Sequence, residues 1–188
     1  MSLGQDTKRA LRGAAIGVAV LWLVHLVNAL TGYELNRFGI WPRTLAGLPG
    51  IGLSPLLHAN LLHLVANSGP FFVGLVAIRL LARRSALPVV AALWLGTGAL
   101  VWLLGRSLIH VGASGVVYAM LAWIVVRGFR SGDLRGIILG VVIAVLYLPI
   151  LVGVLPSFGP VSWESHLAGV VVGILLALKL SDRRLPRL

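Results

Sequence analysis

The chain contains no cysteine, and carboxylates are scarce: its 188 residues include 16 Lys and Arg but only 5 Asp and Glu. The missing thiol excludes disulfides, cysteine nucleophiles and cysteine-ligated zinc. Zinc hydrolases of the His-Glu-x-x-His type are excluded because that pattern is absent. Aspartyl chemistry within a membrane is excluded because the three aspartates lie outside the apolar runs. We expect neither a metal nor another cofactor.

Charged residues make up only 11% of the chain, whereas 59% of its residues are hydrophobic and the mean hydropathy is +0.99. A soluble domain of this size has too little interior to hide so much apolar surface. Long apolar runs with few charges predict transmembrane helices. We therefore expect an all-α polytopic membrane protein, a single domain over residues 1–188 that bundles six transmembrane helices. The expected spans lie near 12–31, 59–82, 86–105, 113–129, 135–155 and 163–181.

The stretch between the first two spans, residues 32–58, is too rich in Trp, Tyr, Pro and Leu for a solvated linker. We expect this first loop to lie partly in the membrane interface, where Trp and Tyr are favoured. The other connections are short. The outer end of the fifth span contains Pro149, Gly153, Pro156 and Gly159, which predict an irregular helix end.

The basic residues indicate the orientation. With six spans, 13 of the 16 Lys and Arg fall on the side of both termini, and only Arg37, Arg43 and Arg106 fall on the other side. This asymmetry predicts cytoplasmic termini, as for a protein of the bacterial inner (plasma) membrane. The positive charge is thereby explained by membrane anchoring, and we expect no nucleic-acid partner. Both lysines, Lys8 and Lys179, are then cytoplasmic, which excludes an outer-facing Ser-Lys pair.

Two polar groups stand out within the apolar runs. Ser114, in Gly112-Ala113-Ser114-Gly115, opens the fourth run, and His166 lies near the start of the sixth. Each precedes a cytoplasmic anchor, Arg127 or Lys179, by 13 residues, so both are expected about 20 Å above the inner boundary. Polar side chains at such a depth are functional candidates. A hydroxyl and an imidazole at one level suggest a serine hydrolase.

Further polar groups are expected at a similar depth. His63 and Asn67 are four residues apart and share a helix face, whereas His58 is expected to precede the regular helix. Gly169 and Gly173 form a Gly-x-x-x-Gly pair that favours close helix packing. For any one of these residues an ordinary structural hydrogen bond or helix contact is an alternative. His25 is expected to be structural, and His110 to be solvated without a catalytic role.

Taken together, these motifs closely resemble the rhomboid family of intramembrane serine proteases. The resemblance covers about residues 39–173: His58-x4-His63-x3-Asn67, Gly112-Ala113-Ser114-Gly115 with Tyr118, and His166-x2-Gly169-x3-Gly173. Trp41-Pro42-Arg43 is similar, more loosely, to the first loop of the family. The resemblance implies the minimal six-span bacterial fold, without an added seventh helix.

The resemblance also implies roles. Ser114 would be the nucleophile and His166 its general base, with Tyr118 packed against the imidazole. His63, Asn67 and the Ser114 amide would stabilise the oxyanion. Supporting positions would be His58, Gly112, Gly115, Gly169 and Gly173. Expected partners are the lipid bilayer and single-span transmembrane substrates, cleaved near the outer end of their helix in a site open to the outer side, with entry at the fifth span.

Two other functions are compatible with parts of the sequence. A polar-lined transporter would use the histidines as a relay. The inner halves of the fourth and sixth runs, Leu121–Val126 and Val170–Leu178, are apolar, and no inverted repeat is evident, which disfavours a pathway across the membrane. The second alternative is a catalytically inactive rhomboid-like protein that binds client helices. Ser114 and His166 disfavour it.

Overall fold

The computed structural model describes residues 3–157, 159 and 161–179. Over these residues the chain is helical, and the only β-type pairing is an isolated antiparallel bridge between Ile40 and His110. The expected all-α class is therefore confirmed. Four charged residues near the C-terminus, Asp182, Arg183, Arg184 and Arg187, lie outside the described residues.

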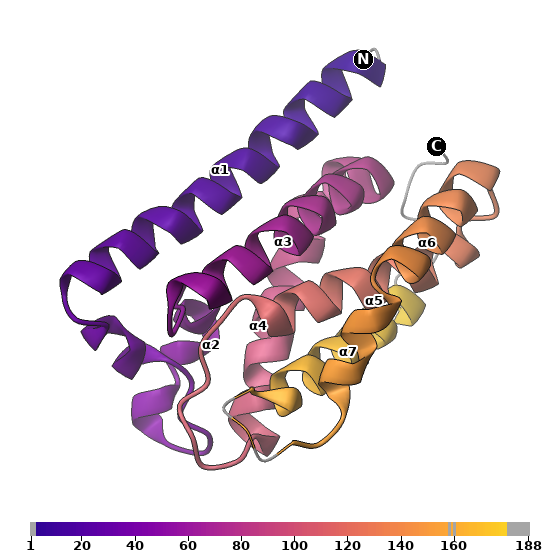
Figure 1. Ribbon diagram of the computed structural model, residues 1–188. Coiled ribbons are helices and arrows are strands. Elements are labelled where there is room, and N and C mark those ends of the chain that lie inside the picture. The colour runs from indigo at the N-terminus through magenta and orange to yellow at the C-terminus, as the bar shows by residue number, and fades with distance from the viewer. Residues whose placement is uncertain (1–2, 158, 160, 180–188) are drawn as a thin grey trace.

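Six helices of 13 residues or more account for most of the described chain (Figure 1). They are α1 (Leu3–Leu30), α3 (Leu61–Ala82), α4 (Ala86–Leu104), α5 (Ser114–Arg130), α6 (Leu134–Leu146) and α7 (Trp163–Lys179). The segment between α1 and α3 folds into the short helix α2 (Gly50–Leu53) and the 3-10 turns Glu34–Phe38, Leu45–Gly47 and Ser54–Leu56. Further 3-10 turns join α3 to α4 (Arg83–Ser85) and follow α6 (Leu148–Val154).

Local sequence explains where several helices begin and end. The Asn60 side chain accepts a hydrogen bond from the His63 amide and caps α3, so that His58 precedes the helix. Asp133 caps α6 in the same way, accepting from the amides of Arg135 and Gly136. Such caps satisfy amides that have no partner within the helix. Helix α6 ends before Pro149, where the chain continues as a 3-10 turn.

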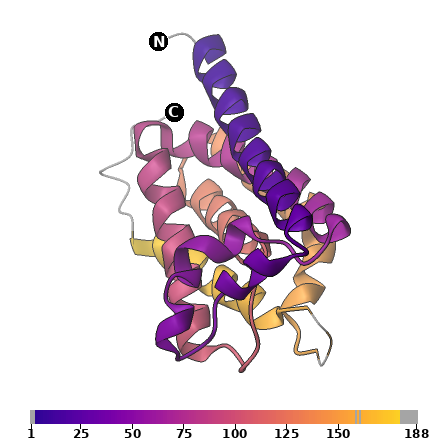
Figure 2. The same cartoon turned by 90° about the vertical axis from the view of Figure 1, so that its left-hand side faces the viewer.

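Helix α5 is the centre of the molecule. It packs against α3, α4, α6 and α7, and its Met120, Trp123 and Ile124 side chains are fully buried. The apolar middle of α5, Ala119–Val126, is buried or half-buried along its whole length, as expected of a helix in such a central position. Helix α1 is peripheral and lies mainly along α3, as the second view shows (Figure 2).

The exposed surface of the helices is strongly apolar. Leu23, Leu30 and Leu87 are 61%, 79% and 78% exposed, and they are three of many such residues. Two helical stretches, Gly4–Leu30 and the nearly continuous Leu61–Leu104, are long and apolar enough to cross a membrane. Helices α5 and α7 have 17 residues each, which corresponds to about 26 Å. Apolar surface of this extent matches a lipid environment better than water.

Candidate active site

The structure brings Ser114 and His166 together. Ser114 is the first residue of α5 and His166 lies in the first turn of α7, so the two neighbouring helices present these side chains at the same level. The Ser114 Oγ lies 2.9 Å from His166 Nε2, which is hydrogen-bonding distance. His166 is only 7% exposed, whereas Ser114 is half-buried.

The second ring nitrogen of His166 determines the proton positions. His166 Nδ1 lies 2.8 Å from the carbonyl oxygen of Gly153, in the 3-10 turn after α6. A carbonyl only accepts hydrogen bonds, so Nδ1 carries the hydrogen and donates it to Gly153. In the neutral ring Nε2 is then the acceptor, and the Ser114 hydroxyl donates to it. This tautomer is the one that a general base for the serine requires.

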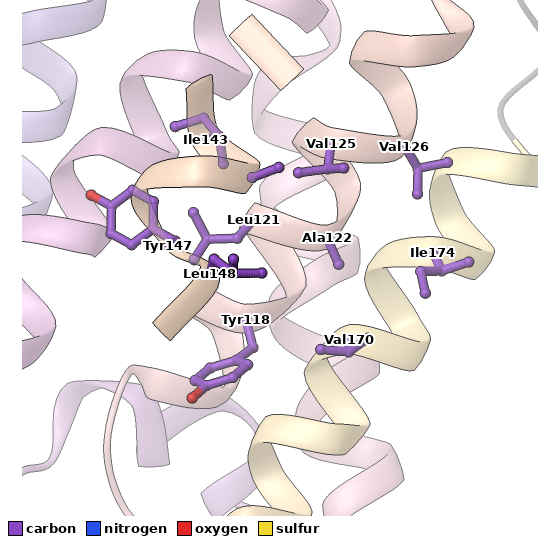
Figure 3. Close-up of a pocket in the computed structure, with 11 residues that line it drawn as sticks. Tyr118, Leu121, Ala122, Val125, Val126, Ile143, Tyr147, Leu148, Val170 and Ile174 are labelled. Atoms are coloured by element: carbon purple, nitrogen blue, oxygen red, sulfur yellow. The ribbon is translucent and has the colours of Figure 1, made fainter. Parts of the chain in front are cut away.

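The ring of Tyr118 holds the imidazole from one side. The two rings are stacked, with centroids 4.2 Å apart and planes inclined by 5°. Tyr118 also lines an apolar pocket of about 210 Å³ between α5, α6 and α7, together with Leu121, Tyr147 and Val170 (Figure 3). A second cavity of about 530 Å³ contains Ser114, His166 and Tyr118. Tyr118 thus lies at the boundary between a polar and an apolar space.

Glycines set the distance between the two helices. A Cβ on Gly169 would collide with the Gly115 carbonyl oxygen and lie 3.0 Å from the Ala119 amide nitrogen. One turn further along α7, a Cβ on Gly173 would collide with the Ala119 carbonyl oxygen. The backbones of α5 and α7 therefore touch directly below the Ser114–His166 pair. The Gly-x-x-x-Gly pair belongs to this contact.

The turn before Ser114 is fixed from two sides. The Gly112 amide donates to the Ser54 carbonyl at 2.9 Å, and the Ala113 amide donates to His58 Nε2 at 3.5 Å. Gly112 has a φ of 119°, and a Cβ there would lie 2.6 Å from the His63 ring, so both conformation and space require glycine. The Ser114 amide, at the N-terminus of α5, has no intrahelical acceptor and is suited to bind a negative charge.

His58 is completely buried just before α3. Burial, with a smaller contribution from the neighbouring His63, lowers the pKa of His58 to about 4. Its ring is therefore neutral at neutral pH, and Nε2 has the lone pair needed to accept from Ala113.

His63 and Asn67 line the same 530 Å³ cavity as Ser114. Asn67 Nδ2 donates one hydrogen bond to the His63 carbonyl at 2.9 Å within α3. An amide group has two such hydrogens, so one remains for another acceptor. The structure thus gathers His63, Asn67, Ser114 and His166 around one cavity, while His58 supports the turn behind it.

His110 differs from the expectation. It is 3% exposed rather than solvated. Its Nδ1 lies 2.6 Å from Ser162 Oγ, and its Nε2 lies 3.0 Å from the Arg106 carbonyl. The prediction was wrong because the loop before α5 folds inward, pairing with Ile40 of the first loop.

Two further features of the site were not predicted from the sequence. The Gly153 carbonyl, which orients His166, is a backbone group without a sequence signature. Arg106 clamps the segment between α6 and α7: its Nε lies 2.6 Å from Glu164 Oε1, and its two other nitrogens donate to the carbonyls of Ser157, Gly159 and Val161. The only available signal was that Arg106 and Glu164 are opposite charges at the outer helix ends.

Comparison with known proteins gives a consistent result. A family model described as the Rhomboid domain matches residues 48–183. An uncharacterized protein of Mycobacterium tuberculosis is 36% identical over 173 residues, which cover 87% of this chain and 72% of the relative. An uncharacterized protein of Mycobacterium leprae is 35% identical over 194 residues, covering 94% of this chain and 76% of the relative.

Proposed function

The chain belongs to the rhomboid family of intramembrane proteases and is an integral membrane protein, and from this premise we propose that it is a serine endopeptidase with Ser114 and His166 as its catalytic pair. The observation that carries the proposal is the chain of hydrogen bonds from Ser114 Oγ through His166 to the Gly153 carbonyl. It supplies a nucleophile, a base in the required tautomer and a group that orients the base.

In the proposed reaction, the Ser114 oxygen attacks the carbonyl carbon of a peptide bond while His166 Nε2 takes the hydroxyl proton. The same proton then passes to the leaving amine as the C–N bond breaks. Water, deprotonated by His166, hydrolyses the resulting ester and restores Ser114. Nε2 of His166 faces Ser114, so the Gly153 carbonyl at Nδ1 and the stacked Tyr118 ring are the groups that orient the imidazole.

Attack places a negative charge on the substrate oxygen. We assign its stabilisation to the Ser114 amide, Asn67 and His63, which line the cavity around the serine. One pre-oriented donor is worth about 10²–10³ in rate. The remaining Asn67 hydrogen and the N-terminal position of Ser114 support this assignment.

The proposed substrates are single-span transmembrane proteins. Their scissile carbonyls are held in helical hydrogen bonds, so cleavage requires local unwinding, which small or helix-weakening residues favour. We propose that both termini of the enzyme are cytoplasmic, as the distribution of Lys and Arg predicts. The site then faces the outer side, and cleavage occurs near the outer end of the substrate helix.

The alternative of an inactive client-binding protein lacks a supporting observation. A protein that only binds helices has no need for a serine hydroxyl donating to an oriented imidazole. A transporter is disfavoured because an apolar pocket, rather than a polar path, lies beyond Tyr118.

The test uses purified full-length protein in lipid vesicles and a single-span substrate with small residues near the outer end of its helix. Wild type is expected to cleave it, and Ser114→Ala or His166→Ala to lower the rate at least about 10³-fold. A fluorophosphonate probe is expected to label wild type at Ser114. Ser107→Ala, which removes an exposed serine on the same side, is the control and should retain activity and labelling.

Retention of near-wild-type cleavage by Ser114→Ala would remove the proposed nucleophile. Labelling at another serine would have the same consequence. Binding of the substrate without any cleavage by wild type, in vesicles where the probe also fails to react, would favour the client-binding alternative.

A further inference from the structure

A pocket opens between helices α1, α3 and α6, far from the candidate active site. It has a volume of about 190 Å³ and is lined by Arg79, Arg83, Arg135, Asp6, Leu81 and Leu139, among others. The N-terminal end of α1, the C-terminal end of α3 and the N-terminal end of α6 lie at the same end of the molecule (Figure 1), and each contributes residues to the pocket. In the proposed orientation this is the cytoplasmic surface of the membrane.

The charge of the pocket is positive and largely unneutralised. Three guanidinium groups face one carboxylate, that of Asp6. Within the described part of the chain, no ion pair joins Arg79, Arg83 or Arg135 to a carboxylate. Arg79 does donate to the Arg83 carbonyl at the end of α3, which holds the two arginines next to each other. The nearby Asp133 is occupied in capping α6.

Polar and apolar groups are ordered by depth in this pocket. On α6, Arg135 lies in the first turn and Leu139 lies one turn deeper on the same face. On α3, Arg83 lies at the helix end and Leu80 and Leu81 lie before it, toward the membrane interior. Arg79 begins deeper on α3 than either leucine, but its side chain reaches toward the helix end and donates to the Arg83 carbonyl. Guanidinium groups gathered at the surface, with Leu81 beneath Arg83 and Leu139 beneath Arg135, match a molecule that has an anionic head and an apolar tail.

We propose that this pocket binds the headgroup of an anionic glycerophospholipid, with its phosphate between Arg79, Arg83 and Arg135 and its acyl chains along Leu81 and Leu139. Guanidinium groups bind phosphate oxygens through paired hydrogen bonds, and basic pockets between membrane helices are suited to such headgroups. Asp6 also lines the pocket, where its carboxylate would accept a hydrogen bond from a headgroup hydroxyl. The bound lipid would join the inner ends of α1, α3 and α6, although α6 packs mainly against α5.

The test measures lipid binding by the purified full-length protein in a zwitterionic detergent. Titration with a short-chain anionic glycerophospholipid is expected to raise the melting temperature and to saturate, and the matching phosphocholine lipid to have little effect. Arg83→Gln with Arg135→Gln should weaken the anionic lipid at least tenfold. Arg83→Lys with Arg135→Lys keeps the charge and should retain an intermediate affinity.

Arg84→Gln with Arg130→Gln is the matched control, because both arginines are exposed and neither lines the pocket. It should change the affinity less than twofold. An equal loss in the two double Gln variants, which remove the same charge, would overturn the proposal, since binding would then follow total charge. Equal stabilisation by both lipids, or saturation of the site by inorganic phosphate at the same concentration as the lipid, would overturn it as well.

This inference depends on the membrane insertion and orientation of the chain but not on its chemistry. The readout is lipid affinity, and fluorophosphonate labelling of Ser114 is followed in the same samples. In the wild type, absence of lipid binding with intact labelling therefore counts against the pocket alone, and absence of labelling with intact lipid binding counts against the catalytic proposal alone.

Discussion

The first turn of α7 and the two turns below it contact the same neighbour, α5, in different ways. In the first turn, His166 meets Ser114 and Tyr118 through a hydrogen bond and a ring stack. Below it, Gly169 and Gly173 bring backbone against backbone. The polar turn carries the candidate chemistry, while the glycine contact sets the separation at which a 2.9 Å hydrogen bond forms. The two glycines, which have no side chain, therefore determine the distance between the reactive side chains of Ser114 and His166.

Among variants that keep both Ser114 and His166, the largest effect is expected from breaking the glycine contact. In Gly169→Ala the new methyl group collides with the Gly115 carbonyl, so α5 and α7 must separate. A shift of about 1 Å removes the hydrogen bond between Ser114 and His166 and lowers cleavage about 10²-fold. Overpacking should also destabilise the protein by about 1–3 kcal/mol, measured as a lower melting temperature.

The control for this variant is Gly69→Ala in α3, where an added Cβ has no heavy atom within 4 Å. It should be fully active and equally or more stable, because alanine favours a helix. Equal behaviour of the two variants would mean that the glycine contact does not set the spacing.

A smaller effect is expected from removing the aromatic ring of α5 that holds His166 in place. Tyr118→Ala removes the ring stacked on His166 and joins the polar cavity to the apolar pocket. The imidazole is then free to leave its orientation, and kcat should fall about 10–100-fold, with less change in KM. Tyr118→Phe keeps the stack and should stay within about fivefold of wild type. A larger loss in the Phe variant than in the Ala variant would assign the role to the hydroxyl group instead of the ring.

The contacts of Arg106 allow a test of whether the outer loops help to position the first turn of α7, which carries His166. Arg106→Gln removes the ion pair with Glu164 and the bonds to the α6–α7 segment, while leaving α5 and α7 intact. We expect faster limited proteolysis of that segment and a change of about three- to tenfold in cleavage rate. Arg43→Gln is the control, since Arg43 bonds to carbonyls of Leu103 and Gly105 but not to that segment. Identical proteolysis of the two variants would show that Arg106 does not hold the segment between α6 and α7 in place.

The smallest effect concerns pH. The pKa of His58 is about 4 in the folded protein, below the ordinary value of 6.5. Between these values the unfolded chain binds more protons, so the stability from neutral His58 is present above pH 6.5 and is lost as the pH falls toward 4. The wild-type melting temperature should therefore decrease more between pH 7 and 4.5 than that of His58→Gln, by the equivalent of about 1–3 kcal/mol. Parallel decreases would show that other groups account for the acid sensitivity.

Hydropathy located the long helices, except that the fifth run was expected to continue to residue 155 whereas α6 ends at Leu146 and a 3-10 turn follows. Motif spacing placed Ser114 and His166 at one level, and the resemblance to the rhomboid family paired them. Apolar runs predict helices because backbone groups in lipid must bond internally. The equal distances from Ser114 to Arg127 and from His166 to Lys179 predict a shared level because both helices have the same rise per residue. The glycine pair on α7 predicts close approach to a neighbouring helix because small residues allow helix backbones to come into contact.

Features that depend on the conformation of loops could not be predicted from the sequence. The Gly153 carbonyl is one of many identical backbone acceptors, and only the path of the chain after α6 brings it to His166. The burial of His110 follows from pairing with Ile40, 70 residues earlier in the chain. The contact of Arg106 with Glu164 requires two loops to meet. None of these arrangements has a periodicity or spacing from which it can be inferred.

The group that orients His166 is neutral, and this limits how fast the proposed reaction can proceed. A carbonyl dipole selects the ring tautomer as a carboxylate does, but it brings no full negative charge to balance the imidazolium that forms during attack. If the proposed reaction is slow for this reason, a captured helix would have time to escape before it is cut. Helices that remain unwound for long periods would then be hydrolysed preferentially, and selectivity would arise from the dynamics of the substrate as much as from its sequence.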